Sequence, residues 1–108
     1  MAVSFYITHR YGGDDRDVPL EALDGLIAEL HDDPSDVEHP SVSVVHESDW
    51  ALAVYGSGLV TLENVEDLGI NPRHMRLGRP EDSRDLLAAL AQGDLDRVFN
   101  ADWLPGYG

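Results

Sequence analysis

Residues 50–63 read WALAVYGSGLVTLE, and this stretch decides the fold of the chain. Trp50, Leu52 and Val54 alternate with their neighbours, and the second half of the stretch alternates in the same way, which is typical of half-buried strands. Between the two halves, Gly56-Ser57-Gly58 supplies the positive φ angles that a tight turn needs. The stretch therefore predicts two antiparallel strands joined by a hairpin.

Further strand patterns flank this hairpin. Residues 3–8 and 41–44 each alternate apolar with polar side chains, which predicts two strands before it. Residues 73–77 follow a loop and are expected to form a fifth, short edge strand. Arginines on such a strand would discourage aggregation edge to edge.

Two helices are indicated by apolar residues at helical spacing. The first runs from Pro19 to Leu30 and the second from Pro80 to Ala91. Gly93 is expected to end the second helix in a left-handed conformation, and Asp94 to cap a short third one. The element order is β-α-β-β-β-(β)-α-α, so residues 1–108 are expected to be a single α+β domain. Its mainly antiparallel sheet of four or five strands would carry the helices on one face.

Charge is the dominant feature of the composition. The 108 residues include 21 acids, seven arginines and no lysine, for a net charge of -14. This excess excludes nucleic acid and anionic membranes as partners, and it serves either solubility or the attraction of a basic protein. The chain has no cysteine, and neither a signal peptide nor a membrane-spanning run is recognisable. We therefore expect a cytoplasmic protein.

No motif for chemistry is present. Without lysine there is no phosphate-binding loop and no Schiff-base chemistry, and no two histidines have the spacing of a zinc site on a helix. Asp14, Asp15 and Asp17 fail as a calcium loop and are interpreted as a turn before the first helix. We thus expect no catalytic residue, no cofactor and no metal. Glu47, Asp49 and Glu63 are the best carboxylate candidates, with a solvated sheet edge as the simpler interpretation.

Three surfaces are candidates for binding. The sheet face away from the helices carries hydroxyl and small residues with two tyrosines, and it is either solvated or a contact surface. The tail with Trp103 and Tyr107 is either pinned to the core or an anchor for a partner. Arg73, His74 and Arg76 either pair with the acidic loop or recognise an anion. On the strands, the residues expected to face away from the helices are Tyr6, Thr8, Arg10, Ser41, Ser43, Ala51, Ala53 and Tyr55.

A resemblance covers residues 50–107. Short segments in this range, a little over half of the chain, resemble a group of small, uncharacterised actinobacterial proteins. More remotely, the acidic α+β organisation is similar to that of immunity proteins of bacterial polymorphic toxin systems. Neither resemblance implies a catalytic residue. The segments that carry the first one are Ser57-Gly58-Leu59-Val60, Glu63-Asn64-Val65, Pro72-Arg73-His74-Met75, Gln92-Gly93-Asp94-Leu95 and Trp103-Leu104-Pro105-Gly106-Tyr107.

The sequence favours a non-enzymatic protein-binding domain, such as an immunity-type inhibitor of a basic toxin or nuclease. The alternative is a small-molecule-binding or accessory enzyme domain, with a pocket between sheet and helices near His46, Glu47 and Arg73. A homodimer through the open sheet face is a third hypothesis. The expected partner-binding residues are Glu47, Asp49, Trp50, Tyr55, Glu63, Trp103 and Tyr107.

Overall fold

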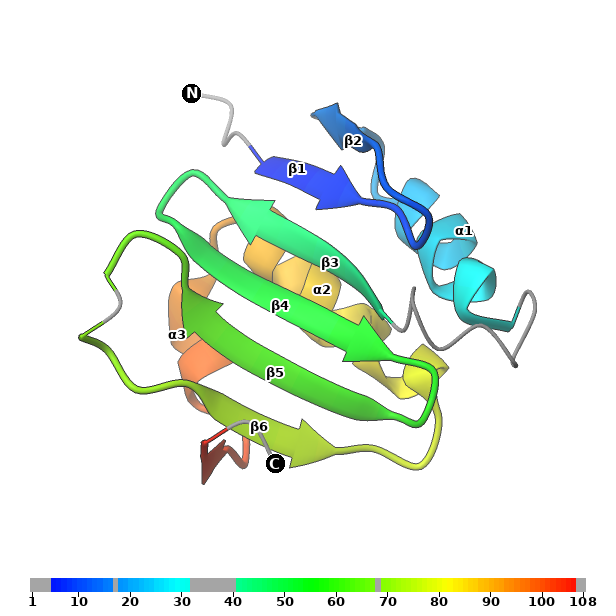
Figure 1. Ribbon diagram of the computed structural model, residues 1–108. Coiled ribbons are helices and arrows are strands. Elements are labelled where there is room, and N and C mark those ends of the chain that lie inside the picture. The colour runs from blue at the N-terminus through cyan, green and yellow to red at the C-terminus, as the bar shows by residue number, and fades with distance from the viewer. Residues whose placement is uncertain (1–4, 17, 32–40, 68, 107–108) are drawn as a thin grey trace.

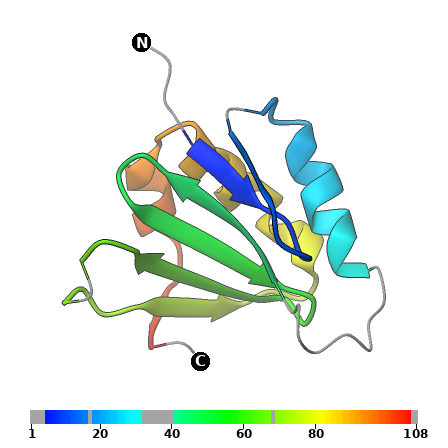
Figure 2. The ribbon, with the colours of Figure 1, turned by 45° about the horizontal axis from the view of Figure 1, so that its top comes forward.

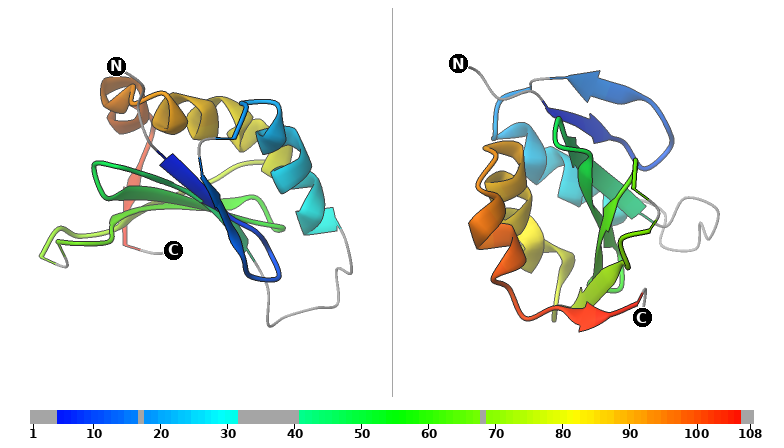
Figure 3. Two further views of the ribbon diagram at one scale, coloured as in Figure 1. Left: turned by 90° about the horizontal axis from the view of Figure 1, so that it is seen from above. Right: turned by 90° about the vertical axis from the view of Figure 1, so that its left-hand side faces the viewer.

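A layer of helices covers one face of an antiparallel sheet (Figures 1 and 3). The computed structural model describes residues 5–16, 18–31, 41–67 and 69–106. In this part of the chain the sheet has seven strands in the order β2-β1-β3-β4-β5-β6-β7. They are β1 (Phe5–Thr8), β2 (Asp14–Arg16), β3 (Ser41–His46), β4 (Trp50–Tyr55), β5 (Leu59–Asn64), β6 (Arg73–Arg76) and β7 (Leu104–Pro105).

The helices follow the predicted pattern with shifted starts. The described α-helices are α1 (Ala22–Ala28), α2 (Arg84–Ala91) and α3 (Leu95–Phe99). A 3-10 turn, η1 (Glu29–His31), extends α1, and another, η2 (Pro80–Ser83), precedes α2. The first helix was predicted to begin at Pro19, but that residue accepts a turn hydrogen bond from the amide of Ala22, 2.9 Å away. Propensity places such boundaries only to within a few residues.

The predicted end of α2 and the predicted start of α3 are confirmed. Gly93 has a φ of 78°, the left-handed conformation that ends α2. The side chain of Asp94 accepts a hydrogen bond from the amide of Arg97 and so caps α3. Two predicted features, the acidic loop at 32–40 and a cap at Asp17, lie outside the described residues.

The α+β class is confirmed, but the predicted count of four or five strands is too low. The β2 segment was interpreted as a turn because turn residues (Gly12-Gly13-Asp14-Asp15) occur there without apolar alternation. In the structure its three residues, Asp14 to Arg16, are all exposed. β7 is two residues long and ends in a proline, so it carries no periodicity. Both lie at the edges of the sheet, where charged residues and proline are tolerated because few backbone groups must be paired.

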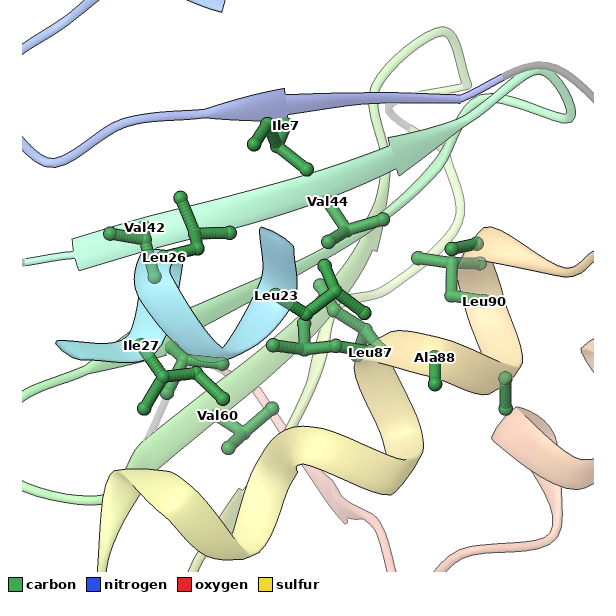
Figure 4. Packing of buried hydrophobic residues seen from close by; sticks show 14 of the residues in the cluster. Ile7, Leu23, Leu26, Ile27, Val42, Val44, Val60, Leu87, Ala88 and Leu90 are labelled. Carbon is green, nitrogen blue, oxygen red and sulfur yellow. The ribbon is translucent and has the colours of Figure 1, made fainter. Parts of the chain in front are cut away.

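The hydrophobic core lies between the two layers (Figure 4). Leu87 and Leu90 of α2, together with Leu23 of α1, are completely inaccessible to solvent. They pack against Val44 and its neighbours on the sheet. Each such side chain contributes about 1.5–3 kcal/mol by burial. The apolar periodicity of α2 is therefore what attaches the helix layer to the sheet.

The other face of the sheet faces the viewer in Figure 1, with α2 and α3 behind it. Strand register places Ser43, Ala53, Thr61 and His74 in one row across this face. Arg10 was predicted on the same face, but it is buried, and its guanidinium donates to the backbone oxygen of Glu29. The strand ends at Thr8, so the alternation of faces no longer applies two residues later.

In the part of the chain that the structure describes, no helix combines the length and the apolar composition that crossing a bilayer requires.

The hairpin turn between β4 and β5 provides a stability test. Gly58 has a φ of 91°, and a Cβ added there would lie 2.3 Å from the backbone oxygen of Leu77. We expect Gly58→Ala to lower the free energy of unfolding by about 1–3 kcal/mol, because both the backbone conformation and the close approach exclude a side chain. Urea denaturation measures this difference.

Gly25→Ala is the matched control. Gly25 lies within α1, and an added Cβ would meet nothing within 4 Å. The control should gain up to about 1 kcal/mol from helix propensity. If Gly58→Ala were as stable as the native protein, the close packing of the turn against Leu77 would be refuted.

Candidate functional site

Carboxylates gather in a pocket at the end of the sheet where the β3–β4 turn and the start of the β5–β6 loop meet. The pocket has a volume of about 270 Å³. Glu47, Asp49 and Glu66 line it together with apolar and aromatic side chains. We call it the acidic pocket; its lining residues are Phe5, Tyr6, Arg16, Val45, His46, Glu47, Asp49, Val65 and Glu66.

The β3–β4 turn holds two of these carboxylates in place. Asp49 has a positive φ, 72°, and aspartate tolerates this conformation better than most non-glycine residues. Its amide donates to the His46 oxygen at 2.9 Å, and its own oxygen accepts from the amide of Val65 at 2.9 Å. The second bond joins the turn to the β5–β6 loop, and it brings Glu66 beside the turn.

His46 contributes an unusual polar group beneath the turn. The amide of Ser48 donates to Nδ1 of His46 at 3.1 Å, so in the neutral ring the proton belongs on Nε2. That nitrogen is buried and has no hydrogen-bond partner among the described residues. A buried donor that stays unpaired costs about 1–3 kcal/mol.

The carboxylates of the acidic pocket are not neutralised from within. Among the described residues, Glu47, Asp49 and Glu66 make no ion pair, although Arg16 also lines the pocket. The guanidinium of Arg16 lies 5.1 Å from the ring centre of Tyr6, in a cation–π contact. Three negative charges therefore remain available at one end of the sheet.

The structure divides the predicted partner-binding residues into separate groups. Glu47 and Asp49 share the acidic pocket, and Glu63 lies at the same end of the sheet, opposite Ala51 on the open face. Tyr55 is at the other end of β4. Over the five residue steps from Trp50 that distance is about 17 Å. Tyr55 and the acidic group therefore belong to different ends of the sheet.

The two tryptophans lie on the helix side. Trp50 packs edge-on against Phe99 of α3, with ring centres 4.9 Å apart. Trp103 donates from Nε1 to the backbone oxygen of Val98 at 2.7 Å, which pins the tail to α3. Both rings are partly buried, and Trp103 lines a shallow pocket with Arg73. Tyr107 lies outside the described residues.

Sequence reasoning missed Val65 and Glu66 as site residues, and it assigned Tyr6 to the open sheet face without placing it beside the carboxylates. Tyr6 reaches the pocket because β1 pairs with β3, so that Tyr6 lies opposite Val45. Val65 is 42% exposed, which is unusual for a large apolar residue, and it places an apolar contact beside the carboxylates. The pairing of β1 with β3 joins segments more than thirty residues apart, and local periodicity carries no signal for it.

The residues predicted for a small-molecule pocket are only partly together. His46 and Glu47 line the acidic pocket, whereas Arg73 lies elsewhere, with its guanidinium 5.9 Å from the ring centre of Phe99. The acidic loop at 32–40, with which Arg73, His74 and Arg76 were predicted to pair, lies outside the described residues. Within the described ranges neither Arg73 nor Arg76 makes an ion pair. His74 bonds through Nδ1 to the Gly106 oxygen at 3.1 Å.

A second cluster joins the β1–β2 hairpin to the helix layer, where α1 lies beside the hairpin (Figure 2). His9 contacts Glu29 through Nδ1 and Asp15 through Nε2, each at 2.6 Å. The hydrogen bond to Asp15, followed by that to Glu29, raises the pKa of His9 above its ordinary value of 6.5. Since both ring nitrogens are occupied, this imidazole clamps the hairpin to η1 and has no nitrogen free for catalysis.

Nothing in the described residues is arranged as a metal centre. No group of three or more histidine, aspartate or glutamate side chains there is placed to hold an ion. In the same 3-10 turn as Glu29, His31 bonds to Glu81 of η2. The pKa of Glu81 is lowered, first by its own backbone amide and then by His31.

Comparisons with protein-family models, with curated proteins and with solved structures gave no match to this chain. The resemblances inferred from the sequence therefore stay predictions, and the functional argument rests on the geometry of the acidic pocket.

The His9 cluster makes stability depend on pH. Because the pKa of His9 is raised in the folded protein, its contribution is complete below about pH 6.5 and is lost as the pH rises through the higher folded value. We expect the native protein to lose more stability than His9→Asn between pH 6 and about pH 9. Urea denaturation at both pH values measures this, and an NMR titration of the His9 ring reports its pKa directly.

The groups that face His9 are Asp15, Glu29 and the backbone of Arg10, whose amide donates to Glu29 at 2.9 Å. His31→Asn is the control, since His31 contacts Glu81 at a different place. Equal pH profiles for the native protein and His9→Asn would contradict the clamp.

Proposed function

We propose that the chain is a non-enzymatic, cytoplasmic protein-binding domain that docks a basic partner at the acidic pocket. The observation that carries this proposal is the convergence of three carboxylates without an ion pair in the described residues, beside Tyr6 and an exposed Val65. Carboxylates attract a lysine or arginine, and the adjacent apolar and aromatic groups supply contact area. This combination suits the insertion of a basic side chain.

The net charge of -14 supports the same partner class. A strongly acidic protein accelerates its encounter with a basic one by electrostatic steering, and this advantage decreases with salt. An immunity-type inhibitor of a basic toxin or nuclease would use such a surface, because the carboxylates stand in for the phosphates of the toxin's substrate. The pocket would then fix the position of the partner after the encounter.

The rest of the predicted set has a different part in this proposal. Glu63 extends the negative surface onto the open sheet face, next to Ala51. Trp50 and Trp103 hold α3 and the tail, so they support the scaffold and do not form the contact. Tyr55 lies too far along β4 to share a partner side chain with Asp49.

The test compares two variants of equal charge in an affinity capture from the cells that produce the protein. The site variant is Glu47→Gln, Asp49→Asn, Glu66→Gln. The control is Glu21→Gln, Asp85→Asn, Asp96→Asn, whose three acids are exposed on or beside the helices. A basic protein retained by the native chain should also be retained by the control, and its capture by the site variant should fall about tenfold or more.

The captured protein is then assayed for nuclease or other toxic activity with and without a stoichiometric amount of the native chain. Inhibition by the native chain and by the control, but not by the site variant, supports the immunity-type role. Equal loss in both variants would show that total charge matters and the pocket does not. Failure of the native chain to retain any basic protein at low salt would overturn the proposal.

A further inference from the structure

A second pocket lies at the opposite margin of the sheet, between β6 and the segment that leads into β7. Its volume is about 590 Å³, within the range of about 300–1,000 Å³ that small-molecule sites occupy. It shares no residue with the acidic pocket. We call it the edge pocket; its lining residues are His74, Met75, Arg76, Leu77, Leu86, Ala101, Asp102 and Leu104.

The floor of the edge pocket is apolar. Met75 belongs to the hydrophobic core, and Leu77, Leu86 and Ala101 pack against that core while remaining partly exposed. Leu104 is 55% exposed and adds apolar surface at the outside. Covering these side chains would be favourable, so the floor suits an apolar group of the size of a leucine or phenylalanine side chain.

The mouth of the edge pocket carries one charge of each sign. Arg76 and Asp102 are both exposed, and neither makes an ion pair within the described part of the chain. Continuing the β6–β7 register, in which His74 lies opposite Leu104, sets Asp102 level with Arg76. A guanidinium and a carboxylate thus line the same pocket without forming an ion pair within the described residues.

The backbone of Arg76 adds a donor and an acceptor. The amide of Leu77 bonds to the Gly58 oxygen at 2.8 Å, toward β5. Because successive residues of a strand direct their backbone groups to opposite sides, the N–H and C=O of Arg76 point toward β7. Pairing with β7 ends at His74, so both groups are unpaired among the described residues.

We propose that the edge pocket binds a free α-amino acid with a large apolar side chain. The ligand carboxylate meets the guanidinium of Arg76, the ammonium meets Asp102, and the side chain covers the floor at Leu86. Charge favours this zwitterionic ligand over a ligand that carries only an anionic or only a cationic group. A lone anion is opposed by Asp102 and by the net charge of -14, and a lone cation is opposed by Arg76, whereas a zwitterion meets both groups favourably.

The test is a ¹H–¹⁵N NMR titration of the full chain with L-leucine and L-phenylalanine. We expect saturable shift changes centred on Arg76, Leu77 and Asp102. Glycine, 4-methylpentanoate and 3-methylbutylamine each lack one part of the ligand: the side chain, the ammonium and the carboxylate, respectively. Each should bind about tenfold more weakly or worse.

Variants test the two charges separately. Arg76→Gln and Asp102→Asn should each weaken amino-acid binding by about tenfold. Arg97→Gln and Asp96→Asn, on exposed positions of α3, should leave it unchanged. The spectra of the four variants also report whether the fold is intact, which is expected because all four positions are exposed.

Three results would overturn the proposal. The first is the absence of saturable shifts at the edge pocket with both amino acids. The second is equally tight binding of 4-methylpentanoate or 3-methylbutylamine. The third is an equal effect of Arg97→Gln and Arg76→Gln. None of these results involves the acidic pocket, so the proposed docking of a basic partner is tested separately.

Discussion

The packing of α2 against the middle of the sheet is the interaction on which the rest of the structure depends. Leu87 and Leu90 are fully buried between this helix and the strands, and α1 and α3 join the layer beside α2. Arg84 strengthens the layer by bonding from Nε to Asp24 of α1 at 3.1 Å. Because these helices all lie on one side, the other face of the sheet and its ends are left for contacts with other molecules.

Both candidate sites lie where this two-layer packing ends. The acidic pocket forms beyond the last buried pairs of β3, β4 and β5, where the β3–β4 turn and the β5–β6 loop are joined by the bond from Val65 to Asp49. The edge pocket forms where β7 stops pairing with β6 and the floor of the core is left partly uncovered. In each case the pairing between neighbouring strands stops, and the residues that follow the paired segments line the pocket.

How far the sequence predicts this arrangement depends on whether a feature is local. The hairpin at Gly56 to Gly58, the end of α2 at Gly93 and the start of α3 at Asp94 are encoded within a few residues, and they were predicted correctly. β2 and the partnership of β1 with β3 depend on distant segments and were not. The acidic pocket shows the same division: Glu47 and Asp49 were selected from the turn, whereas Tyr6 enters through the pairing of β1. Arg10 turned inward because the strand had already ended.

The small number of cations explains why the acids of the pocket have no ion-pair partner among the described residues. With 21 acids and seven arginines, complete pairing is impossible. Even so, Arg16 and Arg73 form no ion pair among the described residues. Arg16 lies over Tyr6 and Arg73 over Phe99, where the rings attract the guanidinium without requiring a carboxylate. Arg79 and Arg84 pair with acids of the helix layer, away from the acidic pocket. These arginines thus contact aromatic rings or acids of the helix layer, and no ion pair among the described residues neutralises Glu47, Asp49 and Glu66.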